Sequence, residues 1–145
     1  MADMSSNSVS IDAPAADVMA VLVDIESFPT WSSAIKEVEV LERDGDGRAC
    51  QVKVKVEAGA LKDRATLSYD YSKLPNEISF SLDDADLMTE MNGAYQVKDN
   101  GDDTTTVTYS LGVAISMPIP DIMRRKAEQA TIDAALGQLK KRVEG

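Results

Sequence analysis

The order of the expected elements constrains the fold of this 145-residue chain most strongly. A short strand and two small helices come first, a long run of alternating strands follows, and one amphipathic helix closes the chain. Strands joined by hairpins form an antiparallel sheet, and alternation of apolar and polar residues buries only one face of it. The single C-terminal helix must then cover that face. We therefore expect an α+β fold, in which a curved antiparallel sheet wraps around a long helix and leaves an apolar hollow.

The alternating pattern is clearest at residues 50–57, where Cys and three Val occupy one face and Gln, two Lys and Glu the other. Turn signals rich in Gly, Asp, Asn or Pro separate the strands. Seven strands are expected, near residues 8–12, 35–40, 50–57, 65–71, 78–82, 87–97 and 107–115. Gly93 inside the sixth predicts a bulge or a sharp bend.

Proline residues mark where the helices begin and end. Pro14 suits the first turn of a helix, because its missing N–H has no partner there. Pro29 ends that helix, and a second short helix is expected at residues 29–33. The C-terminal helix is expected over Ile119–Val143, about 37 Å at about 1.5 Å per residue, enough to cross the sheet. Its expected apolar stripe is Ile119, Ile122, Met123, Ala127, Ala130, Ile132, Leu136, Leu139 and Val143.

Composition indicates a core built from aliphatic residues. Only 5% of residues are aromatic, and seven are Met, which gives a soft interior. Such an interior suits either a cavity with variable contents or ordinary gap filling. Cys50 is the only cysteine, so no intrachain disulfide forms, which is typical of a reducing compartment. The polar N-terminus does not resemble a signal peptide and no stretch reaches the ~18 apolar residues of a membrane span. We expect a cytoplasmic protein without a transmembrane segment.

Charge argues against nucleic acid as a partner. The net charge is −10, whereas duplex binding needs a basic face that neutralises phosphates. Residues 118–145 nevertheless carry six basic and four acidic residues. This basic helix either complements an acidic sheet or makes transient contact with an anionic membrane surface. Arg124, Arg125 and Lys126 lie near the helix N-terminus, where the helix dipole disfavours cations, and this favours an anionic partner.

The chain contains no histidine. That removes the usual general base near neutral pH, the Ser–His and Cys–His pairs, and the commonest metal ligand. No nucleotide-binding motif is present. We therefore expect no metal and no cofactor, and assign no catalytic residue. Tyr, Arg, Asp or Glu inside a cavity would have to carry any chemistry.

Two segments resemble the polyketide cyclase/dehydrase and lipid-transport family of the START-related, birch-pollen-allergen-like SRPBCC superfamily. Residues 9–31 carry the opening Val-Ser-Ile-Asp-Ala-Pro and the later Asp-Ile-Glu-Ser-Phe-Pro-Thr-Trp, and residues 118–121 lead into the long helix as Pro-Ile-Pro-Asp. The resemblance covers nearly the whole chain. It implies a helix-grip fold, with residues 1–145 forming one START-like ligand-binding domain. The family includes aromatase/cyclases, coenzyme-Q-binding proteins, lipid carriers and ribosome-associated toxins, so these segments mark a fold rather than an activity.

Three functions from different classes fit this sequence. The first is binding or transport of an apolar small molecule, such as a lipid, an isoprenoid or a polyketide-like compound, by a monomer or homodimer. The second is a cyclase or dehydratase, which predicts at least two polar groups facing each other across the cavity. The third is a protein-interaction module. We place the binder first, because the chain lacks an obvious nucleophile or base.

Candidate ligand contacts come from inward strand positions, the lone tryptophan and the first half of the C-terminal helix. For each of them, packing in the core is the alternative interpretation. Arg64 and Glu90 lie in mid-strand, where they either grip a polar group of the ligand or point to solvent. The candidate contacts are Trp31, Val52, Val54, Leu67, Tyr69, Met91, Tyr109, Met117, Ile122, Met123 and Ala127.

Overall fold

A sheet of seven strands and three helical segments make up the computed structural model, which describes residues 4–58, 61–116 and 119–145. The first part of the chain is helical between two strands: β1 (Ser5–Ile11), α1 (Ala15–Val23), the 3-10 helix η1 (Ile25–Thr30) and β2 (Ile35–Arg43). Hairpin strands follow: β3 (Ala49–Ala58), β4 (Leu61–Asp70), β5 (Glu77–Ala85), β6 (Met88–Asp99) and β7 (Thr105–Ile115). The long helix α2 (Asp121–Glu144) comes last.

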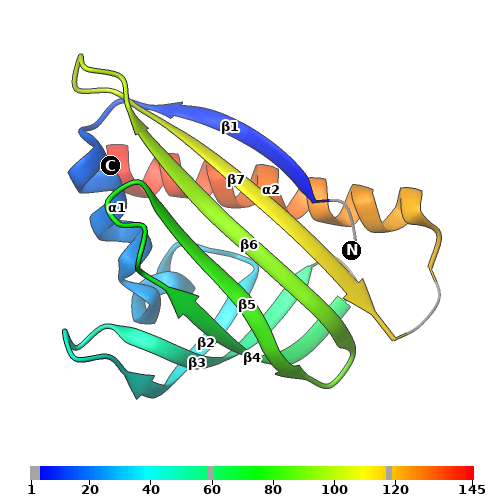
Figure 1. Ribbon diagram of the computed structural model, residues 1–145. Coiled ribbons are helices and arrows are strands. Elements are labelled where there is room, and N and C mark those ends of the chain that lie inside the picture. Colours follow the sequence, from blue (N-terminus) through cyan, green and yellow to red (C-terminus); the bar gives the residue numbers. More distant parts are fainter. Residues whose placement is uncertain (1–3, 59–60, 117–118) are drawn as a thin grey trace.

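The strands form one antiparallel sheet in the order β1-β7-β6-β5-β4-β3-β2. Consecutive strands β1 and β2 therefore lie at opposite edges, and α1 with η1 carries the chain from one edge to the other. Figure 1 shows the sheet curling, with α2 lying across its concave side. The predicted α+β helix-grip architecture is confirmed.

Alternate residues of the central strands form the core. Val52, Leu67, Val107 and Leu111 point to the concave side and are buried. The second half of α2 meets them with Ile132, Leu136 and Leu139. Each large apolar side chain buried in this way contributes about 1.5–3 kcal/mol. The helix is therefore held on the sheet mainly through its C-terminal half.

The first half of α2 differs from the expected stripe. Ile122 and Met123 are 65% and 59% exposed, whereas Glu128 is only 3% exposed. The helix also begins at Asp121, two residues after the expected start. Figure 1 shows the first turns of α2 extending past β1. Arg124 and Glu128 line the cavity, and at about 100° per residue Ile122 and Met123 point away from it. The apolar stripe that faces the core therefore does not reach the first turns of α2.

The second short helix begins earlier than expected, at Ile25 rather than residue 29, and Pro29 lies inside it. The hydrogen bonds of a 3-10 helix join residues three apart, and this explains how the helix can contain a proline. The N–H of Ser27 donates to Asp24 O, and that of Trp31 donates to Phe28 O, so the missing N–H of Pro29 interrupts neither bond. This turn places Phe28 and Trp31 edge to face, with ring centroids 5.2 Å apart, beside the sheet.

Gly93 forms no bulge, because the pairing of β6 with β7 is regular from Met91 to Asp99. Its role is close packing. Gly93 pairs with Phe80 on β5, and a Cβ at Gly93 would overlap the Phe80 ring. The glycine therefore lets this ring lie flat against β6.

We predict that Gly93→Ala lowers the free energy of unfolding by about 1–3 kcal/mol, because the Phe80 ring must move. Gly137→Ala is the matched control. A Cβ at Gly137 in α2 meets nothing, so that change should stabilise by about 0.5–1 kcal/mol. Urea denaturation of both variants measures the two effects, and equal changes would contradict the packing role of Gly93.

Candidate functional site

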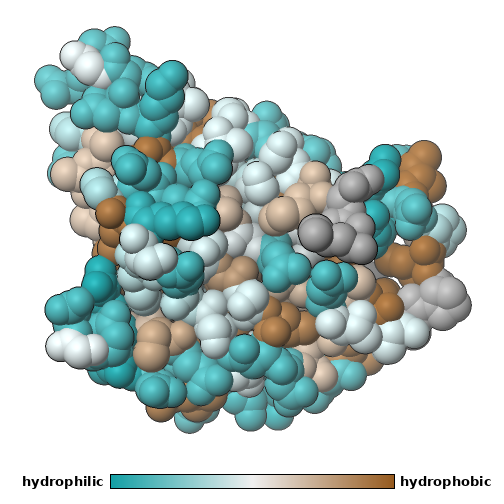
Figure 2. All heavy atoms as spheres, viewed as in Figure 1, coloured by the Kyte–Doolittle hydropathy of each residue, from teal (hydrophilic) through white to brown (hydrophobic). Residues whose placement is uncertain are grey.

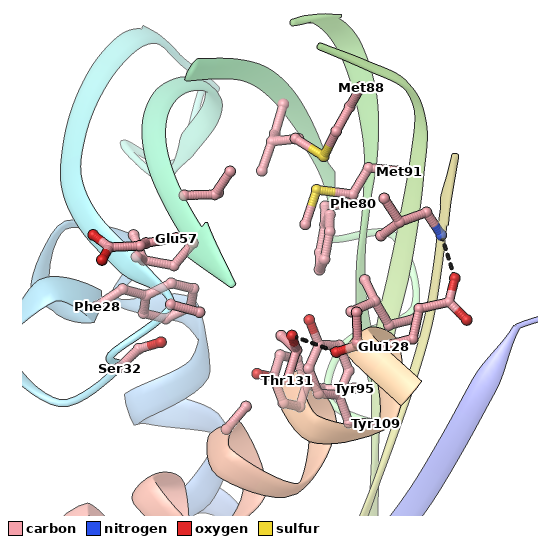
Figure 3. A pocket seen from close by; sticks show the side chains of 18 of the residues that line it. Phe28, Ser32, Glu57, Phe80, Met88, Met91, Tyr95, Tyr109, Glu128 and Thr131 are labelled. Atoms are coloured by element: carbon pink, nitrogen blue, oxygen red, sulfur yellow. Dashed lines mark hydrogen bonds between the residues drawn. The ribbon is translucent and has the colours of Figure 1, made fainter. Parts of the chain in front are cut away.

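A cavity lies between the concave face of the sheet, the segment that contains η1, and the first half of α2. The cavity has a volume of about 160 Å³, counted as the positions that the centre of a water molecule can occupy. Figure 3 shows Phe28 and Ser32 on one side, Phe80 and Met91 on another, and Tyr95 near α2. Aliphatic, aromatic and methionine side chains make up most of the wall. Such a wall favours an apolar occupant, and a few polar groups would orient it.

Six of the candidate contacts lie on this wall. These residues come from the end of η1, from three strands and from α2. Their contact with a ligand stays a prediction. These wall residues are Trp31, Leu67, Tyr69, Met91, Tyr109 and Ala127.

Four candidates in the described part of the chain do not line the cavity. Val52 and Val54 are buried in the core, at 0% and 2% exposure, but lie outside the wall. Ile122 and Met123 are exposed to solvent on α2, for the reason given above. Met117 lies outside the described residues.

Some wall residues were missed, although the alternating pattern could have identified most of them. Tyr95 and Leu111 occupy inward positions on the same strands as predicted contacts, and Phe80 occupies an inward position on β5. Glu128 carried no such signal, because a charged helical residue is expected to face solvent. The wall residues that were not among the predicted contacts include Phe28, Ser32, Phe80, Tyr95, Leu111 and Glu128.

Glu128 joins α2 to the edge of the sheet. Its carboxylate accepts hydrogen bonds from Ser5 Oγ (2.8 Å), the Val113 backbone N–H (2.7 Å) and Arg124 Nη1 (2.8 Å). Val113 lies beyond the last residue pair of β1 and β7, which joins Ser5 to Leu111. The carboxylate therefore takes the place of a strand for this N–H. In Figure 3 it points away from the open space, towards β7.

A second buried carboxylate, Asp63, shapes the cavity rather than facing a ligand. It is 7% exposed and accepts hydrogen bonds from the backbone N–H groups of Met88 (2.9 Å), Leu87 (3.1 Å) and Arg64 (2.8 Å). These bonds fix the turn between β5 and β6. They thereby hold Met88 at the start of β6, where it lines the cavity.

Three tyrosines provide most of the hydroxyl groups of the wall. Tyr95 and Tyr109 pair across β6 and β7 and stack, with ring centroids 4.1 Å apart and an interplanar angle of 14°. Tyr69 on β4 lies 5.5 Å from the Phe80 ring, centroid to centroid. Burial raises the pKa of all three hydroxyls well above the usual value of 10.0. They are therefore neutral at physiological pH and able to donate.

The charged mid-strand residues do not contribute to the cavity. Arg64 is exposed and Glu90 is half-buried, and neither lines the wall. In the ranges that the structure describes, no three His, Cys, Asp or Glu side chains come together as a possible metal site. The polar groups of the wall are mainly the tyrosine hydroxyls, Ser32, Thr131 and the paired Arg124.

We predict that Glu128→Ala lowers the free energy of unfolding by about 2–4 kcal/mol, since it leaves the Val113 N–H and Arg124 without their acceptor. Hydrogen exchange of the Val113 amide should accelerate. Asp133→Ala on the same helix removes the acceptor of two exposed hydrogen bonds, donated by Asn7 and Gln129, and should cost less than about 1 kcal/mol. Equal losses in the two variants, with unchanged exchange at Val113, would contradict this assignment.

Solved structures of similar proteins share the fold. A START superfamily protein from Mycobacterium smegmatis is 27% identical, with a TM-score of 0.91, covering 98% of this chain and 97% of that one. The Zhui aromatase/cyclase from Streptomyces sp. R1128 is 17% identical, with a TM-score of 0.81, covering 99% and 94%. Ara h 8.0201 is 14% identical, with a TM-score of 0.70, covering 99% of both chains. The last two likenesses concern the fold alone.

No curated protein sequence matches this chain. The family model described as "Polyketide cyclase / dehydrase and lipid transport" matches residues 11–140. This match includes α1, η1, the sheet from β2 to β7 and α2 as far as residue 140. The chain belongs to the polyketide cyclase/dehydrase and lipid transport family.

Proposed function

We propose that this protein binds or transports an apolar small molecule, such as a lipid, an isoprenoid or a polyketide-like compound, in the cavity beneath α2. The observation that carries the proposal is the wall itself. Apolar side chains from η1, the sheet and α2 surround an open space, and its main hydroxyl groups are neutral. Within this proposal residues 1–145 act as one ligand-binding domain, and the single Cys50 suits a reducing cytoplasm.

The cavity supports a binder better than a cyclase or dehydratase. Ser32 and Tyr95 do face each other across the open space (Figure 3), as an enzyme of that kind requires. Neither is a base at neutral pH. The carboxylate of Glu128 already accepts three hydrogen bonds, and that of Glu57 points away from the centre of the cavity. Removal of a proton from a bound substrate therefore has no suitable acceptor among the described wall residues.

Blocking the cavity mouth tests the proposal. We predict that Ala127→Phe weakens binding of the neutral fluorophore N-phenyl-1-naphthylamine by at least about tenfold, because the ring enters the cavity. Ala127 is exposed on α2, so the larger side chain should not disturb the core. Fluorescence titration measures the affinity, and quenching of Trp31, the only tryptophan, reports on the same site.

Ala130→Phe is the matched control, because Ala130 is also exposed on α2 but does not line the cavity. Its affinity for the fluorophore should equal that of the wild type. A wild-type protein that fails to bind the fluorophore, or two variants with the same affinity, would overturn the proposal.

The start of α2 suggests how an apolar ligand arrives. Ile119, Ile122 and Met123 are 39%, 65% and 59% exposed, and they lie beside Arg125 and Lys126. Figure 2 shows apolar residues at this end of the molecule, and Ile119 also lines the cavity. No helix in the described ranges is long and apolar enough to cross a bilayer. We propose that this end makes transient contact with an anionic membrane surface, where apolar side chains enter the interface and cations meet headgroups.

We predict that the double variant Ile122→Ser and Met123→Ser binds less to vesicles made of equal parts phosphatidylcholine and phosphatidylglycerol. Each exposed apolar side chain that enters the interface adds affinity in proportion to the area it buries. Leu41→Ser is the control, because Leu41 is 47% exposed on β2, at the opposite sheet edge from β1. Vesicle co-sedimentation measures binding, and equal binding of all three proteins would contradict the membrane contact.

A further inference from the structure

One row of paired residues runs across the middle of the sheet. Tyr69 of β4 pairs with Phe80 of β5, and Phe80 pairs with Gly93 of β6. Gly93 in turn pairs with Leu111 of β7. Tyr69, Phe80 and Leu111 all line the cavity, so this row belongs to the wall. Gly93 has no side chain, and it therefore leaves a gap in the row.

The Phe80 ring occupies the gap that Gly93 leaves. A Cβ atom at Gly93 would overlap Cζ and Cε1 at the tip of this ring, so the ring lies directly over the glycine. On the side of β4, the Tyr69 ring lies 5.5 Å from the Phe80 ring, centroid to centroid. Figure 3 shows the Phe80 ring between Met91 and Tyr95. Phe80 is thus enclosed along the surface of the sheet, and the open space of the cavity is the side on which its ring has room to move.

The position of this ring decides how much space the wall leaves. The three atoms nearest to a Cβ at Gly93 all belong to the Phe80 ring, so removal of the ring would deepen the cavity towards β6. A methyl group at Gly93 would have the opposite effect. Carbon atoms in contact lie about 3.5–4.0 Å apart, so the methyl group would push the tip of the ring by about 1 Å or more into the cavity.

We propose that Phe80, positioned by Gly93, determines the largest apolar ligand that the cavity accepts. Met88 and Met91 lie on the same wall, and their flexible side chains adapt to ligands of different shape. The Phe80 ring is rigid and enclosed, so it limits how deep a ligand can reach. This inference rests on the proposed function, because it names the residue that sets the size limit of the same cavity.

A homologous series of ligands measures this limit. The series is the straight-chain primary alcohols from 1-hexanol to 1-tetradecanol, and competition with N-phenyl-1-naphthylamine gives the affinity of each alcohol. Each methylene group that enters an apolar wall should strengthen binding by about fourfold. A methylene group that finds no room should add nothing or weaken binding. The chain length at which the affinity stops rising is therefore the size limit of the cavity.

We expect two substitutions to move this limit in opposite directions. Phe80→Ala should raise it by about two to four methylene groups, because the removed ring leaves room for a longer chain. Gly93→Ala should lower it by about one methylene group or more, because the displaced ring takes up room. Loss of packing alone would not give opposite shifts, since both substitutions destabilise the fold.

A double variant tests whether Gly93 acts through the ring. In the variant that combines Phe80→Ala with Gly93→Ala, the added methyl group has no ring to displace. Its size limit should therefore equal that of Phe80→Ala alone. A role of Gly93 in the backbone only would lower the limit in both backgrounds.

Ile78→Ala is the matched control. Ile78 is 2% exposed and lies two residues from Phe80 on the same face of β5, but it does not line the cavity. Its size limit should equal that of the wild type, although its stability falls. Phe80→Leu takes the place of Phe80→Ala if the latter does not fold, and it should also raise the limit.

The outcomes separate the two proposals. If the alcohols bind but the limit is the same in the wild type, Phe80→Ala and Gly93→Ala, the ring does not set the size of the ligand. The proposed binding function then stands and this inference is wrong. Shifts in the same direction in both variants would also contradict it. If neither the alcohols nor the fluorophore bind to the wild type, both proposals are wrong.

Discussion

One helix has to close the concave face of a seven-stranded sheet, and a helix is too narrow to cover it. Strands lie about 4.8 Å apart, so seven of them span roughly 30 Å, whereas a helix with its side chains is about 10–12 Å across. The main contacts of α2 with the sheet are to β1 and β7 at one edge. At the other edge η1 contacts β2. The curled strands between these contacts leave a space, and the cavity is that space.

The two halves of α2 are held by different forces, and this difference locates the cavity. Ile132, Leu136 and Leu139 bury the second half against the core. The first half has Glu128 as its buried anchor, bonded to Ser5 and Val113. Separation of the second half from the sheet would expose the core, while separation of the first half would mainly exchange hydrogen bonds for water. The cavity lies beneath the half that is held by polar contacts, which is the half that a ligand has to pass.

The sequence predicted the fold through patterns that act over short distances. Alternation identified the strands, prolines and turn residues marked their ends, and both types of signal depend on neighbours in the chain. Inward strand positions such as Leu67, Tyr69 and Tyr109 followed from the same alternation, and they do line the cavity. Features that depend on distant residues were missed. Ile122 and Met123 were placed in the apolar stripe of the helix, but they are exposed, and Arg124 and Glu128 line the cavity instead. Glu128 is buried because Ser5 and Val113 lie opposite, more than ten residues away in the chain.

The shape of the cavity depends on one glycine and on the aromatic rings of its wall. Gly93 lets the Phe80 ring lie flat against β6, so a large side chain that points inward does not fill the space. A wall of aliphatic side chains alone would tend to collapse, because protein interiors pack to high density. Tyr69, Tyr95 and Tyr109 add large rings to this wall that rest on one another or on Phe80. The side chains of the wall therefore leave a space that they do not fill themselves, and an apolar ligand gains contacts by filling it.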